Sequence, residues 1–182
     1  LYGYGGFEVS MQPWYSGGFG LAWYERGGVL VVANIRGGGE FGPSWHQAAV
    51  GEHKQRSYDD FIAVAEDLVR TKVTRPERLG IMGGSNGGLL VGAAMTQRPD
   101  LFGAVVCQVP LLDMQRYHRL LAGASWMAEY GDPDDADPWV DQATADVEIA
   151  AQDSSTHQVP EAGPTHVRIQ QQRVALVLEQ EA

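Results

Sequence analysis

The sequence has 182 residues, 44% of them hydrophobic and 20% charged, which is ordinary for one globular domain that buries a core. The net charge of −10 argues against nucleic acid as a partner, and the single cysteine excludes an intrachain disulfide and a multi-cysteine metal site. No apolar run approaches membrane-spanning length, so we expect no membrane partner and a cytoplasmic location.

The acidic charge gathers at the end of the chain. Residues 132–182 carry 11 acidic and 2 basic residues, whereas residues 1–131 carry 12 acidic and 11 basic residues. Glycine becomes rare at the same place, because only Gly163 follows Gly131. We therefore predict a folded domain over residues 1–139 and an acidic tail of unrecognised sequence over residues 140–182.

The chain opens with a glycine-rich aromatic segment, followed by a predicted strand. Residues 1–7 combine glycines, which let backbone approach a ligand closely, with tyrosines that can donate hydrogen bonds, and a packed aromatic loop gives the same pattern. Residues 28–35 form a short β-branched run, typical of a strand buried on both faces of a parallel sheet. The glycine loop at residues 36–40 lacks the spacing of a phosphate-binding motif, so we do not expect phosphate there.

A helix, a strand, a second helix and a third strand are predicted next. Ser57 is expected to cap the first helix, which ends before Pro76. The apolar face of this helix consists of Phe61, Ile62, Ala65, Leu68 and Val69. The strands are expected over residues 78–82 and 103–109, with a helix between them that ends near Pro99. This alternation requires parallel crossovers, so the fold class is α/β with a doubly wound, mostly parallel sheet.

The remaining polar groups predict neither a metal site nor a cofactor. His46 and His53 are seven residues apart without a third ligand nearby, which favours surface or packing histidines. The acidic loop at residues 132–138 lacks the glycine and the terminal glutamate of a hand-type calcium loop. Cys107 lies in an apolar run and is interpreted as a buried, inert thiol.

The motif that carries chemistry is Gly83-Gly84-Ser85-Asn86-Gly87-Gly88, between a predicted strand and a predicted helix. Gly-x-Ser-x-Gly in that context is the nucleophile elbow of serine hydrolases, although a serine that only caps the helix fits the same letters. The glycines allow a turn too tight for Cβ atoms, and the backbone N–H of Asn86 becomes available to a developing oxyanion.

Four segments together resemble the catalytic domain of the prolyl oligopeptidase family of serine peptidases. They are residues 2–7, 33–42, 83–88 and 97–102, in the order of the family, and the resemblance extends to about Trp139. It implies an α/β-hydrolase fold, incomplete here, and a β-propeller that should precede residue 1. The chain begins at Leu1 without an initiator methionine, so we expect that it is cut from a longer protein.

The resemblance also implies roles for individual residues. Ser85 would be the nucleophile, and the hydroxyl of Tyr4 with the backbone N–H of Asn86 would form the oxyanion hole. The residues alone leave the aromatic cluster between Leu111 and Tyr130 open between a substrate pocket and simple packing. The resemblance favours a pocket for the substrate proline ring, lined by Trp126, Phe7 and Tyr130.

The family's acid and base motifs are not recognisable after Ser85. An α/β-hydrolase needs an aspartate and then a histidine downstream of its serine, and the hydroxyl is a poor nucleophile without them. His118, His157 and His166 follow Ser85, but none lies in a segment resembling the family's base, so no catalytic aspartate or histidine is assigned.

Three functions remain open at this level. The first is a serine endopeptidase that cleaves short proline-containing peptides after proline through an acyl-enzyme on Ser85. The second is another α/β-hydrolase activity, such as an esterase or an aminopeptidase. The third is an inactive fragment that lacks the aspartate and histidine of the triad.

Overall fold

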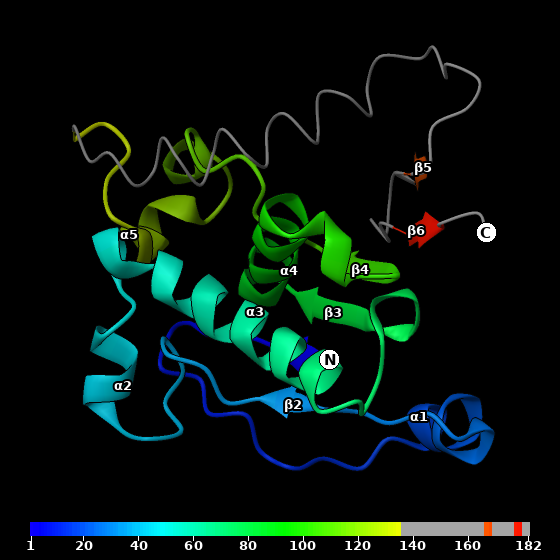
Figure 1. Ribbon diagram of the computed structural model, residues 1–182. Coiled ribbons are helices and arrows are strands. Elements are labelled where there is room, and N and C mark those ends of the chain that lie inside the picture. The colour runs from blue at the N-terminus through cyan, green and yellow to red at the C-terminus, as the bar shows by residue number, and fades with distance from the viewer. Residues whose placement is uncertain (136–165, 169–176, 180–182) are drawn as a thin grey trace.

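The computed structural model describes residues 1–135, 166–168 and 177–179 (Figure 1). The strands are β1 Tyr2–Gly3, β2 Val32–Ala33, β3 Gly80–Gly84, β4 Ala104–Gln108, β5 His166–Arg168 and β6 Val177–Glu179. The α-helices are α1 Gly17–Ala22, α2 Pro43–Gln47, α3 Gln55–Arg70, α4 Asn86–Gln97 and α5 Met127–Tyr130. The predicted boundary after Trp139, the base candidate His157 and most of the acidic tail lie outside these residues.

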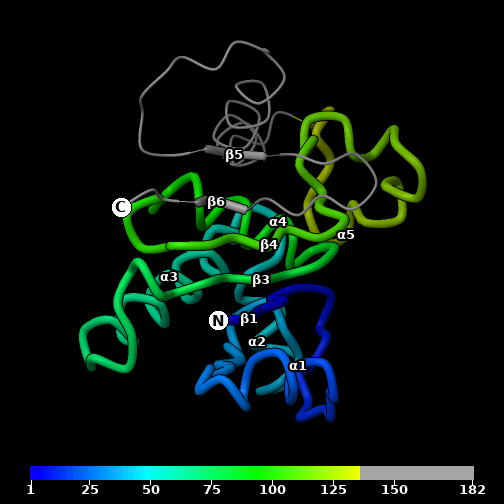
Figure 2. The backbone as a smooth tube through the Cα atoms, turned by 90° about the vertical axis from the view of Figure 1, so that its right-hand side faces the viewer, coloured from blue at the N-terminus to red at the C-terminus, as the bar shows by residue number. Residues whose placement is uncertain are grey.

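Four strands form one parallel sheet in the order β2-β1-β3-β4, which confirms the predicted α/β class. Figure 2 shows β1, β3 and β4 lying one above another. The chain runs from β1 outward to β2 and then returns across β1 to β3 and β4. Strands β5 and β6 form a separate antiparallel pair.

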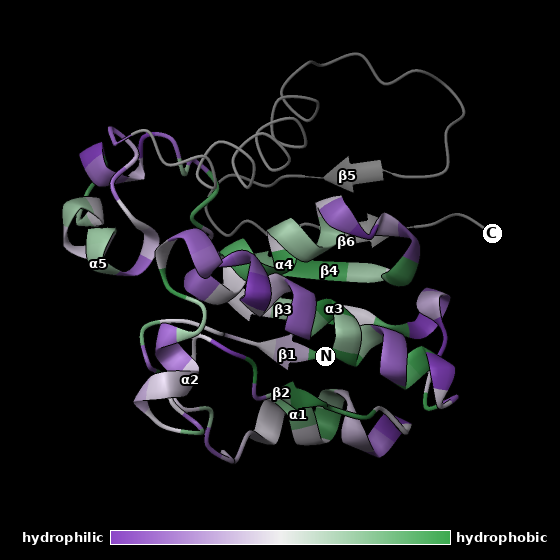
Figure 3. Cartoon of the chain, turned by 60° about the vertical axis from the view of Figure 1, so that its left-hand side comes forward, coloured by the Kyte–Doolittle hydropathy of each residue, from purple (hydrophilic) through white to green (hydrophobic). Residues whose placement is uncertain are grey.

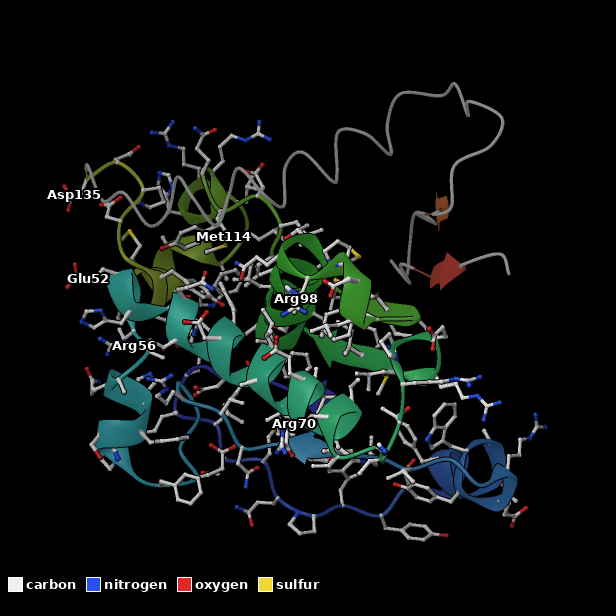
Figure 4. The ribbon with its side chains drawn as sticks, in the orientation of Figure 1. Glu52, Arg56, Arg70, Arg98, Met114 and Asp135 are labelled. Carbon is white, nitrogen blue, oxygen red and sulfur yellow. The ribbon has the colours of Figure 1, made fainter. Side chains whose placement is uncertain are left out.

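Helices α3 and α4 pack on one face of this sheet. A Cβ built on Gly3 in β1 would meet the ring of Phe61 from α3 at 2.7 Å and Leu90 from α4 at 2.9 Å, so both helices press on the same strand. Phe61 and Leu90 are buried, and the charged side chains of α3, such as Arg56 and Arg70, point away from the sheet (Figure 4).

Hydrophobic residues follow this layering, with apolar colour along β2 and β4 and polar colour on the outer turns of α3 (Figure 3). In β3 and β4 every second residue is buried, and Ile81, Val105 and Cys107 belong to the face under the helices. The residues between them are only half-buried or, at Gln108, exposed. The expected inert thiol is confirmed, since Cys107 is buried and burial raises its pKa to about 12.

Two local predictions are wrong. The strand predicted over residues 28–35 and buried on both faces is only two residues long, and its Val32 is half-buried, because β2 pairs with β1 alone at the edge of the four-stranded sheet. Ser57 does not cap α3, which begins at Gln55 after Lys54. The Ser57 hydroxyl instead donates to the backbone carbonyls of Gly5 and Arg36 inside the protein, at 3.2 and 2.7 Å.

The two ends of the sheet differ. Helices α2 and α5 lie beyond the carboxyl ends of the strands, and α1 lies at the opposite end (Figure 1). A cavity of about 550 Å³ opens at that opposite end, lined by residues that include Leu1, Trp23, Val29 and Leu79. None of the helices in the described part of the chain is long and apolar enough to cross a membrane.

Candidate active site

Two loops that leave the sheet at neighbouring strands build the candidate site. The chain leaves β1 toward β2 and leaves β3 toward β4, so the connections diverge between β1 and β3. In open parallel sheets, ligands bind at the carboxyl ends of the strands at such a point of divergence. The loop after β1 carries Tyr4 to Glu8, and the turn after β3 carries Ser85. The cavity at the other end of the sheet is therefore separate from this site.

The turn at Ser85 has the geometry of a nucleophile elbow. A Cβ on Gly83 would lie 2.1 Å from the carbonyl oxygen of Gly87, and a Cβ on Gly87 would lie 2.7 Å from the carbonyl oxygen of Gly3. No side chain fits at either position, because the atoms in the way are backbone atoms. The glycines two residues before and two residues after Ser85 are therefore sterically required.

Ser85 stands exposed at the corner of this turn. Its backbone has φ 57° and ψ −118°, a conformation that favours glycine, and its N–H donates to the Gln108 carbonyl at 3.0 Å. The carbonyl of Ser85 accepts hydrogen bonds from the backbone N–H groups of Gly88 and Leu89 in α4. A strained serine held in this way presents its hydroxyl to solvent instead of folding it into the helix.

The predicted oxyanion donors lie on both sides of Ser85. The side chain of Ser85 faces the hydroxyl of Tyr4 and acts to lower the pKa of that phenol. Burial raises the pKa of Tyr4 and outweighs the opposite effect of Ser85, so the phenol stays protonated and able to donate at neutral pH. Asn86 is the first residue of α4, a position whose N–H has no acceptor within the helix.

The side chain of Asn86 ties the two loops together, a role that the sequence did not predict. Its amide nitrogen donates to the Tyr4 carbonyl at 2.5 Å, and its amide oxygen accepts from the Tyr130 hydroxyl at 2.7 Å. Asn86 is buried, and a Cβ on Gly6 would lie 2.5 Å from its amide. The motif predicts a role only for the backbone N–H of Asn86, because nothing in the motif shows where the side chain points.

The structure brings two of the three predicted pocket aromatics into contact. The rings of Phe7 and Tyr130 meet edge to face, with centroids 5.5 Å apart. Tyr130 is fully buried, and it packs against the Phe7 ring and holds the side chain of Asn86. Trp126 lies one turn before Tyr130, at the end of the short helix Gly123–Trp126, and packs half-buried against the core. No ring contact joins Trp126 to Phe7 or Tyr130 within residues 1–135.

The glycine loop after β2 packs against the loop after β1. A Cβ on Gly37 would lie 2.4 Å from the Gly5 carbonyl, and a Cβ on Gly39 would lie 2.2 Å from the Glu8 carbonyl. The N–H of Glu8 also donates to the Gly37 carbonyl at 3.2 Å. These glycines thus permit backbone-to-backbone packing beneath the candidate site.

A buried ion pair lies behind the same loop, and the sequence did not predict it. Lys54, just before α3, and Glu129 in α5 are 1% and 4% exposed, and their charged atoms are 2.7 Å apart. The other carboxylate oxygen of Glu129 lies 2.7 Å from Nε2 of His46. Burial alone would raise the pKa of Glu129, but Lys54, His46 and the backbone N–H of Phe7 together lower it below its ordinary value.

The histidines with described side chains are engaged away from Ser85. His46 contacts Glu129, His53 lies 3.6 Å from Glu52, and Nε2 of His118 lies 3.2 Å from Asp134. Within residues 1–135, Ser85 has no histidine partner. No general base for Ser85 is therefore placed in this part of the chain.

One group of potential ligands occurs next to the acidic loop. Ligand atoms of His118, Asp132 and Asp134 lie within 4.8 Å of one another. Arg119 donates to both carboxylate oxygens of Asp134, at 2.7 and 2.9 Å, and to Nε2 of His118 at 2.9 Å. The guanidinium of Arg119 already supplies positive charge beside these groups.

Comparison with known proteins gives one consistent result. Residues 14–153 match the prolyl oligopeptidase family. An uncharacterized peptidase of Sinorhizobium fredii is 64% identical over 135 residues, which are 74% of this chain and 19% of that protein. The prolyl endopeptidase of Elizabethkingia miricola is 46% identical over 136 residues, or 75% of this chain and 19% of the relative.

Solved structures agree with the sequence relatives. The structure of a post-proline cleaving enzyme from Rickettsia typhi superposes with a TM-score of 0.73 at 51% identity, covering 81% of this chain and 21% of that one. The similarity therefore includes the α/β-hydrolase fold, incomplete here. The chain spans about a fifth of the length of the curated relatives that it matches.

Proposed function

The chain belongs to the prolyl oligopeptidase family, and on that premise we propose that it carries the nucleophile and oxyanion hole of a serine endopeptidase. The proposed enzyme cleaves short peptides after proline. The observation that carries the proposal is the exposed Ser85, held at φ 57° in a glycine-lined elbow, with the Tyr4 hydroxyl facing its side chain.

The proposed reaction begins with attack of the Ser85 oxygen on the carbonyl carbon of the substrate proline. The carbonyl oxygen becomes an oxyanion, to which the Tyr4 hydroxyl and the Asn86 backbone N–H donate. Collapse of this intermediate releases the amine half of the peptide and leaves the acyl group on Ser85, and water then hydrolyses the ester. The serine proton needs a base, which we place outside residues 1–135, since no histidine contacts Ser85 there.

We propose that the substrate proline ring lies against Trp126 and Phe7. A proline ring is rigid and apolar, and an aromatic face gives it a large contact area at low entropic cost. Phe7 is half-buried and supported edge-on by Tyr130, so it presents a fixed surface. Tyr130 forms the base of this pocket.

The proposal is tested in a hybrid protein, in which a relative supplies the parts of the enzyme outside residues 1–135. The hybrid is the Sinorhizobium fredii peptidase with its matching segment replaced by residues 1–135 of this chain, which is 64% identical to it. We expect it to hydrolyse a proline-amide reporter, and we expect Ser85→Ala to abolish this hydrolysis. Tyr4→Phe should lower kcat by roughly 100-fold, since it removes one oxyanion donor. Ser85-independent hydrolysis would overturn the proposal.

The second candidate, an esterase or aminopeptidase, makes a different prediction in the same assay. It requires that simple esters or amino-terminal amides react faster than the internal proline amide. The elbow and the oxyanion donors are compatible with all three substrates, so the comparison of their kcat/KM values decides. Trp126→Ala should raise KM for the proline amide and leave the simple ester unaffected if the pocket binds proline.

The third candidate, an inactive fragment, concerns the 182-residue chain alone. Since no base contacts Ser85 within residues 1–135, we propose that the purified chain hydrolyses the reporter no faster than its Ser85→Ala variant. We further propose a short proline-containing peptide as substrate, a β-propeller as the missing domain and the cytoplasm as location. The single free thiol is compatible with that compartment.

A further inference from the structure

The buried pair of Lys54 and Glu129 needs an explanation other than stability. Removing two charges from water costs several kcal/mol for each ion, and a buried pair replaced by apolar side chains is often neutral or even more stable. The two residues are 75 positions apart in the sequence and are almost completely buried. Their other contacts show what the pair does in this fold.

Both charged groups also bind the loop that follows β1. Nζ of Lys54 donates to the Gly5 carbonyl at 3.0 Å, and it lies 5.4 Å from the centre of the Tyr130 ring. The backbone N–H of Phe7 is among the groups that lower the pKa of the Glu129 carboxyl. The pair thus holds the loop directly at Gly5, and the Glu129 carboxylate faces the loop at Phe7.

This loop has a conformation that it would not keep by itself. Gly5, Phe7 and Glu8 have φ values of 63°, 55° and 56°, and two of these three residues are not glycine. Non-glycine residues in this conformation are unfavourable and persist only when their surroundings impose it. Tyr4 immediately precedes the strained turn, so the direction of its side chain depends on the turn being held.

We propose that Lys54 and Glu129 are positioning residues, whose buried ion pair fixes the Gly5–Phe7 turn so that the Tyr4 hydroxyl reaches Ser85. The inference rests on the proposed function, since it assigns Tyr4 to the oxyanion hole. Neither charge touches the substrate. The carboxylate and the ammonium act through the backbone of the loop, and His46 completes the set by its contact with the second oxygen of Glu129.

The kinetic test uses Glu129→Gln in the hybrid protein. We expect kcat to fall by about 10- to 100-fold, because a displacement of about 1 Å at a catalytic donor has an effect of this size. In a Tyr4→Phe background the same substitution should cost less than about threefold, because the hydroxyl that it positions is already gone. An equal loss in both backgrounds would overturn the inference.

The matched control removes a carboxylate from another ion pair. Glu66 in α3 pairs with Arg98, which stands on the outer surface of the molecule (Figure 4). Glu66→Gln is the same chemical change at an exposed site, and it should leave kcat and KM unchanged. If Glu129→Gln fails to fold, the double variant Lys54→Met/Glu129→Leu leaves no unpaired buried charge and should show the same loss in kcat.

A second measurement separates this inference from the proposed function. Hydrogen exchange of the peptide that covers residues 2–9 should become at least about tenfold faster in Glu129→Gln and stay unchanged in Glu66→Gln. This result does not depend on catalysis. A hybrid without Ser85-dependent hydrolysis would contradict the proposed function, whereas unchanged exchange in Glu129→Gln would contradict the positioning role.

Discussion

The backbone of Ser85 has a strained conformation that presents the hydroxyl for the reaction that we propose. A non-glycine residue at φ 57° and ψ −118° is held there by the hydrogen bond from its N–H to Gln108 and by the start of α4. Replacement by glycine removes both the strain and the hydroxyl, whereas replacement by alanine removes only the hydroxyl. Stability and activity can thus be separated at one position.

We predict that Ser85→Gly raises the free energy of unfolding of the hybrid by about 1 to 2 kcal/mol, the typical cost of one strained residue. Ser85→Ala keeps the Cβ, so its free energy of unfolding should stay within about 0.5 kcal/mol of the parent. Both variants are inactive in the proposed mechanism. Urea unfolding of the three proteins measures the difference, and equal stability of the glycine and alanine variants would show that the turn is unstrained.

At this scale the motif and the resemblance lead to the candidate site but not to its buried support. The structure brings the predicted residues Ser85, Tyr4 and Asn86 together, and their catalytic roles stay predictions. Lys54 and Glu129 were missed, because a lysine before a helix and a glutamate near an aromatic cluster are usually solvated. Their burial depends on packing between elements that are far apart in the sequence.

At the scale of elements, the elbow contains two kinds of glycine: those without space for a Cβ and one with space for it. Gly83 and Gly87 have no space for a Cβ, because backbone oxygens stand 2.1 and 2.7 Å from where it would be. Gly84 lies between them in the sequence, and its Cβ would be 3.7 Å from the nearest atom, Cβ of Gln108. The motif letters alone do not distinguish these cases.

We therefore predict a large loss of stability for one substitution in the elbow and a small loss for another. Gly87→Ala should destabilise the hybrid by more than about 3 kcal/mol, since the strand β1 or the helix α4 must move to admit the methyl group. Gly84→Ala makes only ordinary contacts and should cost less than about 1 kcal/mol. Thermal unfolding followed by circular dichroism compares them, and equal losses would contradict the packing described for the elbow.

Among the elements, the helices and the strands β3 and β4 were predicted more reliably than the two-residue strands β1 and β2 and the caps. The apolar face of α3 and the ends of α4 and β4 match the expectations, because burial against the sheet enforces the helical period. Strand β2 came out shorter because it pairs with β1 over only two residues, and Ser57 points inward because two buried carbonyls need a donor. These outcomes depend on tertiary neighbours and leave no local signal.

At the scale of the whole molecule, the described residues form part of the candidate active site on part of a sheet. The strands β1 and β3 diverge in their connections and carry the loop of Tyr4 and the turn of Ser85 to the same edge. The chain spans about a fifth of its curated relatives, so substrate entry and proton transfer are proposals that need the rest of the protein. The hybrid supplies that context while keeping residues 1–135.

The most direct measurement is covalent labelling of the hybrid with a proline-containing diphenyl phosphonate, followed by mass spectrometry of its peptides. We predict one adduct, on the peptide that contains Ser85. Labelling should be slower in Tyr4→Phe, because the phosphonyl oxygen loses a hydrogen-bond donor. The Ser85→Ala variant should carry no adduct. An adduct on a different residue, or undiminished labelling of Ser85→Ala, would contradict the assignment of Ser85 as the nucleophile.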